Sequence, residues 1–70
     1  MNLNEKIAKR ILELRKERGL TAEKLAWSAE LSKNCVSSAE QGKYNIKIAS
    51  IEALCKAMDI SLAEFFKTFK

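Results

Sequence analysis

Five polar side chains share one side of a short helix predicted in the middle of the chain. They are Lys33, Asn34, Ser37, Ser38 and Gln41. Residues that follow one another at steps of three and four lie on one face of an α-helix. Each of these side chains can donate or accept hydrogen bonds. The chain contains no histidine that could act as a general base for them. The chemistry that this face offers is therefore recognition of a polar partner.

Residue types for other chemistry are missing. The chain contains no histidine, which removes His-based proton transfer and His metal ligands. Cys35 and Cys55 do not have the spacing of a metal or redox motif, so we expect them to be reduced and structural. The sequence also contains no glycine-rich phosphate loop and no nucleophile–base pair. We expect no enzyme activity, no metal, no cofactor and no small-molecule ligand.

The charge of the chain is unevenly distributed. Thirteen Lys and Arg residues face nine Asp and Glu residues among 70, which gives a net charge of +4. Residues 1–18 carry six basic and three acidic side chains, a net +3, whereas residues 48–70 balance at zero. A basic front half favours a polyanionic partner, and the alternative is a solvated, mildly basic surface. No apolar segment is long enough to cross a membrane, and no signal peptide is visible, so we expect a cytoplasmic protein.

The spacing of apolar residues predicts one all-α domain over residues 1–70. Proline is absent, and apolar residues recur at steps of three and four. Asn2 or Asn4 is expected to cap a first helix that ends at Gly19. Four further helices are predicted at about 22–29, 33–41, 48–58 and 61–69, with Thr21, Ser32 and Ser61 as caps. Ser61 and Glu64 have the spacing of a capping box.

The apolar faces of these helices predict the core. These faces consist of Ile7, Ile11, Leu14, Leu25, Ala26, Ala29, Val36, Ala39, Ile48, Ile51, Leu54, Cys55, Leu62, Phe65, Phe66 and Phe69. Trp27 is expected to pack partly against its neighbours, with an exposed role in partner contact as the alternative. Three phenylalanines exceed the needs of so small a core. At least one is expected inside, and the interface of a twofold dimer is assigned to Phe65, Phe66 and Phe69 with the end of helix 61–69.

Residues 22–41 have the spacing of a helix-turn-helix unit. Two helices of about eight and nine residues flank a short turn. Helices that cross closely need a small residue at the contact, which is Ala26, and the turn needs an apolar plug, which is Leu31. Val36 and Ala39 are expected to face back toward the core, which leaves the polar side chains outward.

The order of these features resembles the lambda-repressor-like family, the Xre, Cro and CI type of bacterial and phage regulators. The resemblance covers about Glu5 to Phe66 and is carried by "RILELRKERGLTAEKLA", "LSKNCVSSAEQGKYN" and "ALCKAMDISLAEFF". It implies a five-helix all-α DNA-binding domain. It also implies a transcriptional regulator, more often a repressor, that binds double-stranded operator DNA as a homodimer.

The resemblance assigns roles to individual residues. Lys33, Asn34, Ser37 and Ser38 match positions that contact base edges in the major groove. Lysine suits the acceptors of guanine, and asparagine suits the donor and acceptor of adenine. The positions that match phosphate contacts are Thr21, Gln41, Gly42, Lys43, Tyr44 and Asn45. Arg15 and Glu40 match a buried ion pair between helices.

The sequence also departs from the family pattern. Ala22 stands where glutamine commonly reaches a phosphate, so one phosphate contact is expected to be lost. Glu30 stands where the turn commonly has glycine, and a left-handed backbone there costs about 1 kcal/mol. These departures and the surplus phenylalanines leave a second hypothesis open. It is a protein-interaction module on the same fold, such as an antitoxin or an anti-repressor partner.

Overall fold

The structure, a computed structural model, describes residues 2–42 and 45–69. Five α-helices follow one another in this part of the chain: α1 (Leu3–Glu17), α2 (Ala22–Ser28), α3 (Lys33–Glu40), α4 (Ile48–Ala57) and α5 (Leu62–Phe66). Their order and number confirm the all-α prediction. The last helix ends at Phe66 and is shorter than predicted.

In the described part of the chain, α1, α2 and α4 end in the same way. The residue after the C-cap has a left-handed backbone, with φ of 65° at Gly19, 59° at Glu30 and 58° at Asp59. The next N–H then bonds back to a carbonyl of the last helical turn, as Leu31 N does to Ala26 O at 2.8 Å. This arrangement is the Schellman motif. It satisfies carbonyls that the helix leaves open and turns the chain sharply.

An apolar residue and a new cap follow each of these turns. Leu20, Leu31 and Ile60 pack against the core. The residues after them cap α2, α3 and α5 through side-chain oxygens: Thr21 accepts from Lys24 N, Ser32 from Cys35 N and Ser61 from Glu64 N. The carboxylate of Glu64 pairs with Lys67 at 2.8 Å, so the predicted capping box at Ser61 is only half formed in the described part of the chain. Four-residue connections therefore suffice between these helices.

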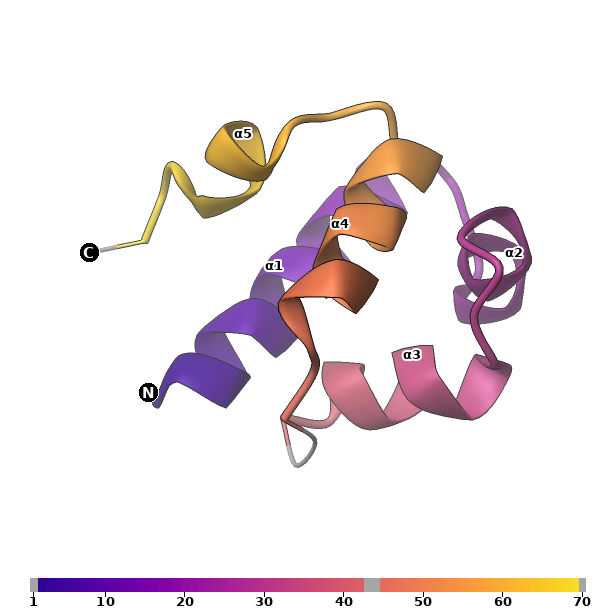
Figure 1. The fold of residues 1–70 in the computed structure, drawn as a ribbon, viewed down its shortest axis with the longest axis horizontal. Helices are drawn as coiled ribbons and strands as arrows, with labels where there is room; N and C mark the ends of the chain where they lie inside the picture. Colours follow the sequence, from indigo (N-terminus) through magenta and orange to yellow (C-terminus); the bar gives the residue numbers. More distant parts are fainter. Residues whose placement is uncertain (1, 43–44, 70) are drawn as a thin grey trace.

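α4 lies in front of α1 in the centre of Figure 1. α2 and α3 occupy one side and the lower end, and α5 crosses above on the opposite side from α2 (Figure 1). Contacts join α2 to α3 and to α4, α1 to α3, and α4 to α5. This arrangement leaves the far side of α3 open to solvent.

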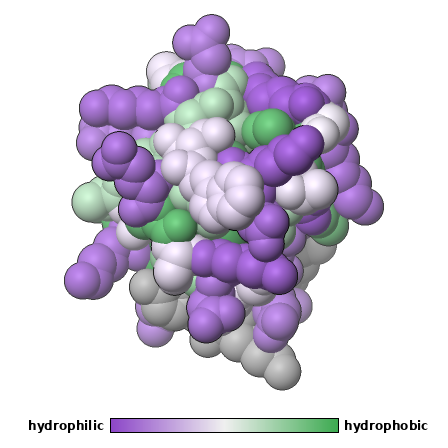
Figure 2. All heavy atoms as spheres, turned by 90° about the vertical axis from the view of Figure 1, so that its right-hand side faces the viewer, coloured by the Kyte–Doolittle hydropathy of each residue, from purple (hydrophilic) through white to green (hydrophobic). Residues whose placement is uncertain are grey.

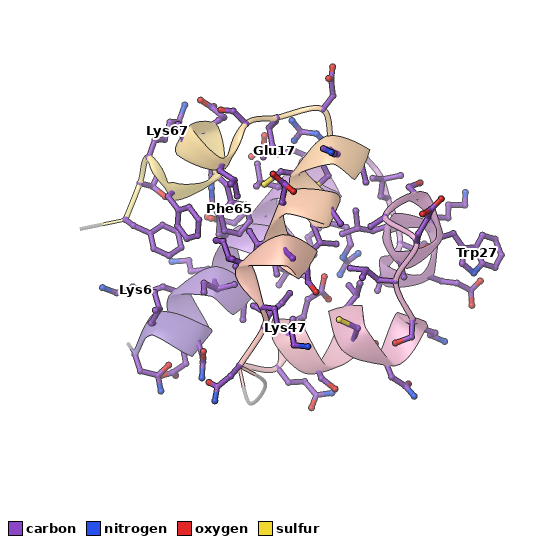
Figure 3. All side chains as sticks on the ribbon, viewed as in Figure 1. Lys6, Glu17, Trp27, Lys47, Phe65 and Lys67 are labelled. Carbon is purple, nitrogen blue, oxygen red and sulfur yellow. The ribbon has the colours of Figure 1, made fainter. Side chains whose placement is uncertain are left out.

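The core confirms most of the predicted apolar faces and corrects three expectations. Ile48 is 60% exposed at the first position of α4, so its assignment to the core is wrong. Trp27 is 70% exposed and points away from the body of the molecule (Figure 3), so the expected partial packing is also wrong. Phe65 is fully buried, which confirms that at least one phenylalanine fills the core. A side chain with no exposed surface cannot contact a partner, so Phe65 is not a dimer-interface residue.

α5 is attached to α1 by a buried arginine. Arg10 is 9% exposed, and its Nε donates to the carbonyl of Phe65 at 2.8 Å. Its Nη2 donates to the carbonyl of Glu64 at 2.9 Å. The last carbonyls of a helix have no partner inside the helix. Arg10 supplies two of these partners and fixes the position of α5.

Candidate nucleic-acid interface

The helix-turn-helix unit forms as the sequence predicted. Ala26 is fully buried where α2 meets α3, and Leu31 packs against the core from the turn. Val36 and Ala39 on α3 are buried as well. A larger side chain at Ala26 would push the two helices apart, because core packing leaves little room for added atoms. The angle between α2 and α3 is thus fixed by side chains that face inward.

The opposite face of α3 presents the polar set. Lys33 and Asn34 in the first turn are exposed, Ser37 and Ser38 are half-exposed, and Gln41 is exposed at the C-cap. The structure therefore brings all five predicted side chains to one open surface. No backbone segment of the described residues covers it in Figure 1, where α3 forms the lower edge of the molecule.

The structure describes four of the six residues predicted to contact phosphates. Thr21 is exposed at the start of α2, and its Oγ1 accepts from Lys24 N at 3.1 Å. Gly42 follows α3 with a left-handed φ of 73°. Asn45 is exposed in the segment that leads to α4. Lys43 and Tyr44 lie outside the described residues.

The predicted ion pair joins α1 to α3. Arg15 Nε lies 2.7 Å from Glu40 Oε2, and Arg15 Nη2 lies 3.2 Å from Glu40 Oε1. Both side chains are mostly buried, with 16% and 13% of their surfaces exposed. Arg15 Nη1 also donates to the carbonyl of Leu20 at 2.9 Å. The pair is structural, since it holds the back of α3 and keeps its polar face outward.

The charges near this surface are mainly positive. Lys33 Nζ lies 3.9 Å from Glu23 Oε2, an exposed and weak pair that leaves the lysine available. Lys47 is exposed at the N-cap of α4, and its side chain extends toward the α3 side of the molecule in Figure 3. Lys47 is not among the residues that the sequence predicts for the site. The positive charge of residues 33–47 was the signal that could have found it.

The neighbouring surface around α2 is largely hydrophilic. Figure 2 shows this face, where charged and polar side chains surround small separate apolar areas. None of the helices found in residues 2–42 and 45–69 is both long and apolar enough to cross a membrane. The same residues hold no group of three side chains that could bind a metal ion. What the geometry offers is a rigid, polar and basic helix face.

A short helix that lies across a second helix and exposes a polar face beside cationic residues defines the class of helix-turn-helix DNA-binding domains. The comparison with protein families agrees, because the helix-turn-helix family model matches residues 11–65. The chain belongs to this helix-turn-helix family.

Individual relatives are regulators. The chain is 34% identical over 58 residues to the HTH-type transcriptional regulator PuuR of Escherichia coli strain K12, and 35% identical over 57 residues to the immunity repressor protein of Bacillus phage phi105. These matches cover 83% and 81% of the chain but only 31% and 40% of the relatives. The chain thus spans less than half the length of these relatives.

Solved structures resemble nearly the whole chain. The wild-type restriction-modification controller protein C.Esp1396I has a TM-score of 0.89 and 31% identity, over 96% of this chain and 87% of its own. A second structure shows that controller as a tetramer in complex with its natural 35 base-pair operator. The controller C.AhdI from Aeromonas hydrophila has a TM-score of 0.86 and 35% identity, over 90% of this chain and 96% of its own.

Proposed function

We propose that this chain is a sequence-specific DNA-binding repressor of transcription. It binds its operator as a homodimer. It is not an enzyme, and it acts in the cytoplasm. The observation that carries this proposal is the open polar face of α3, which the Arg15–Glu40 pair holds outward. The operator complex of the similar controller C.Esp1396I supports it.

In the proposed complex, α3 enters the major groove. Lys33 and Asn34 in its first turn read base edges, and Ser37 and Ser38 add hydrogen bonds. Thr21, Gln41 and Asn45 contact the phosphates on either side, with the cationic Lys47 nearby. Phosphate contacts by cations make affinity fall as salt rises. A base contact contributes about 1–3 kcal/mol of discrimination.

A homodimer extends recognition from one short helix to two half-sites. Two-fold dimers of this class place their recognition helices about 34 Å apart, one helical turn of DNA. Phe66 and Phe69 are half-exposed near the C-terminal end, and α5 lies away from α3 in Figure 1. An interface through these two side chains leaves both recognition faces free for DNA.

The experiment that tests the proposal selects bound duplexes from a random DNA pool at about 150 mM salt. The wild-type chain is run beside the Lys33→Ala/Asn34→Ala double variant and beside Lys56→Ala, a control for the loss of one positive charge at the far end of α4. We expect an enriched near-palindrome with the wild type and the control, and none with the double variant. Circular dichroism checks that all three remain folded.

The exposure of Trp27 favours one second candidate, a protein-interaction module. Large aromatic side chains are enriched where proteins bind each other. If the folded wild-type chain enriches no duplex, the DNA-binding proposal is wrong and a protein partner becomes the better explanation. Amide shifts of residues 33–45 on adding duplex DNA separate the two functions directly.

A further inference from the structure

The first turn of α1 is joined to the segment that follows α3. The side-chain nitrogen of Asn4, Nδ2, donates to the side-chain oxygen of Asn45, Oδ1, at 2.6 Å, although the two residues are 41 positions apart. Asn2 already caps α1, so Asn4 has no role in capping. Asn4 is half-buried in the first turn, and Asn45 is exposed. The bond therefore links α1 to a residue that the proposed function assigns to phosphate contact.

The backbone around this bond is held closely. A Cβ atom added at Gly42 would lie 3.3 Å from Cγ of Glu5 and 3.5 Å from its Cα. Glu5 is itself locked by the capping box of α1. Its N–H donates to Asn2 Oδ1 at 2.8 Å, and its Oε1 accepts from Asn2 N at 3.1 Å. Asn4 thus lies in the helix turn that the capping box holds, and the end of α3 packs against this turn.

The direction of the hydrogen bond decides what Asn45 can offer to DNA. A side-chain amide has one oxygen that accepts and one NH2 group that donates. The NH2 group of Asn4 donates to the side-chain oxygen of Asn45. In the described part of the chain no acceptor is paired with the NH2 group of Asn45. A phosphate oxygen only accepts, so this is the orientation of the amide that suits a phosphate.

We infer that Asn4 is a positioning residue, which holds the Asn45 amide so that its NH2 group donates to a DNA phosphate. The inference rests on the proposed function and adds α1 to the DNA interface. Without Asn4, the amide of Asn45 turns freely and presents its oxygen to the phosphate part of the time. Removing one hydrogen bond to a charged group weakens binding about tenfold or more per half-site.

The test uses the duplex that the wild-type chain enriches, with its phosphates replaced one at a time by neutral methylphosphonates. Wild type, Asn45→Ala, Asn4→Ala, the double variant and Asn4→Asp are titrated with each duplex. We expect one phosphate per half-site at which neutralisation weakens wild-type binding about tenfold. Asn45→Ala should lose this sensitivity, and Asn4→Ala should reduce it. The double variant should bind no more weakly than Asn45→Ala alone.

Asn4→Asp separates positioning from folding. A carboxylate in the first turn favours the helix, so this variant should melt as high as the wild type. It cannot donate to Asn45 Oδ1, and it accepts from the NH2 group instead, which turns that group away from DNA. It should therefore also lose sensitivity at the same phosphate. A melting temperature that falls without a change in the phosphate pattern would assign Asn4 a purely structural role.

Two outcomes overturn the inference, and they can be told apart. If Asn4→Ala and Asn4→Asp keep the wild-type sensitivity while Asn45→Ala loses it, Asn45 binds phosphate without help from Asn4 and the proposed function stands. If the folded wild-type chain enriches no duplex, the proposed function fails and the inference fails with it.

Discussion

Arg15 donates two hydrogen bonds from its guanidinium to the carboxylate of Glu40, at 2.7 and 3.2 Å, and thereby joins α1 to α3. The third bond of Arg15 goes to the carbonyl of Leu20 in the turn before α2. One side chain thus ties together the three segments that set the angle of α3. The pair lies behind the polar face and does not belong to it.

Glu40→Ala should lower the free energy of unfolding by about 3 kcal/mol, because it leaves the mostly buried Arg15 charge without its partner. Base preference, measured by duplex selection, should change little. Urea denaturation gives the stability. Glu23→Ala, which removes an exposed pair, is the matched control and should change stability by less than about 0.5 kcal/mol. An unchanged Glu40→Ala midpoint would contradict the structural role.

Arg10→Met should loosen α5 while retaining most of the buried volume. The carbonyls of Glu64 and Phe65 lose their donor, which costs about 2 kcal/mol. Hydrogen exchange of the amides in 62–66 should speed up more than exchange in α4. Arg18→Met removes a similar bond to the carbonyl of Met58, but from an exposed side chain, and should cost less. Equal effects of the two variants would argue against a special role for Arg10.

Glu30→Gly should stabilise the protein by about 0.5–1 kcal/mol, since glycine adopts the left-handed backbone at this position without steric cost. The side chain of Glu30 is exposed, so its removal opens no cavity. Asp59→Gly is the comparison at the equivalent position after α4. Aspartate tolerates this conformation better than glutamate, and the gain there should be smaller. Thermal unfolding of both variants measures the difference.

Phe69→Ser should weaken the proposed dimer and leave the fold intact. Phe69 is half-exposed and packs edge-on against Phe66, with ring centroids 4.9 Å apart. Loss of a central aromatic contact costs about 2 kcal/mol of association, or about thirtyfold in the dissociation constant. Phe65→Ala, in contrast, should cost about 3 kcal/mol of stability, because Phe65 is in the core. Equilibrium ultracentrifugation gives the mass, and a wild-type monomer at every concentration would refute the dimer.

The two cysteines should differ in reactivity. Burial raises the pKa of the Cys55 thiol above its ordinary value of 9.0, Glu52 raises it further, and Arg10 opposes both effects. The reactive species is the thiolate, so Cys55 should react on the order of tenfold or more slowly than the half-buried Cys35. A Cys35→Ser variant isolates the slow thiol. Fast labelling of Cys35→Ser would show that Cys55 is accessible.

Because the folded-state pKa of the Cys55 thiol is raised, the stability that the neutral thiol contributes is present below pH 9.0 and is lost as the pH rises above it.

The helices, their order and the helix-turn-helix unit are predictable from the amino-acid sequence. These features depend on local signals. Thr21 and Ser32 cap the helices that follow them, Gly19 permits a left-handed turn, and the apolar steps of three and four mark the buried faces. Local interactions act between residues a few positions apart, so they can be read along the chain. The polar face of α3 followed from the same periodicity.

Which side chains are covered, and which of them contact one another, depends on the packing of the helices. Ile48 and Trp27 carry an apolar signal, yet both are exposed. Arg10 carries a polar signal, yet the approach of α5 buries it. The bond from Asn4 to Asn45 spans 41 positions and forms because α1 packs against the end of α3. Exposure and long-range contact depend on how helices are placed in space, and a periodicity along one helix does not contain that information.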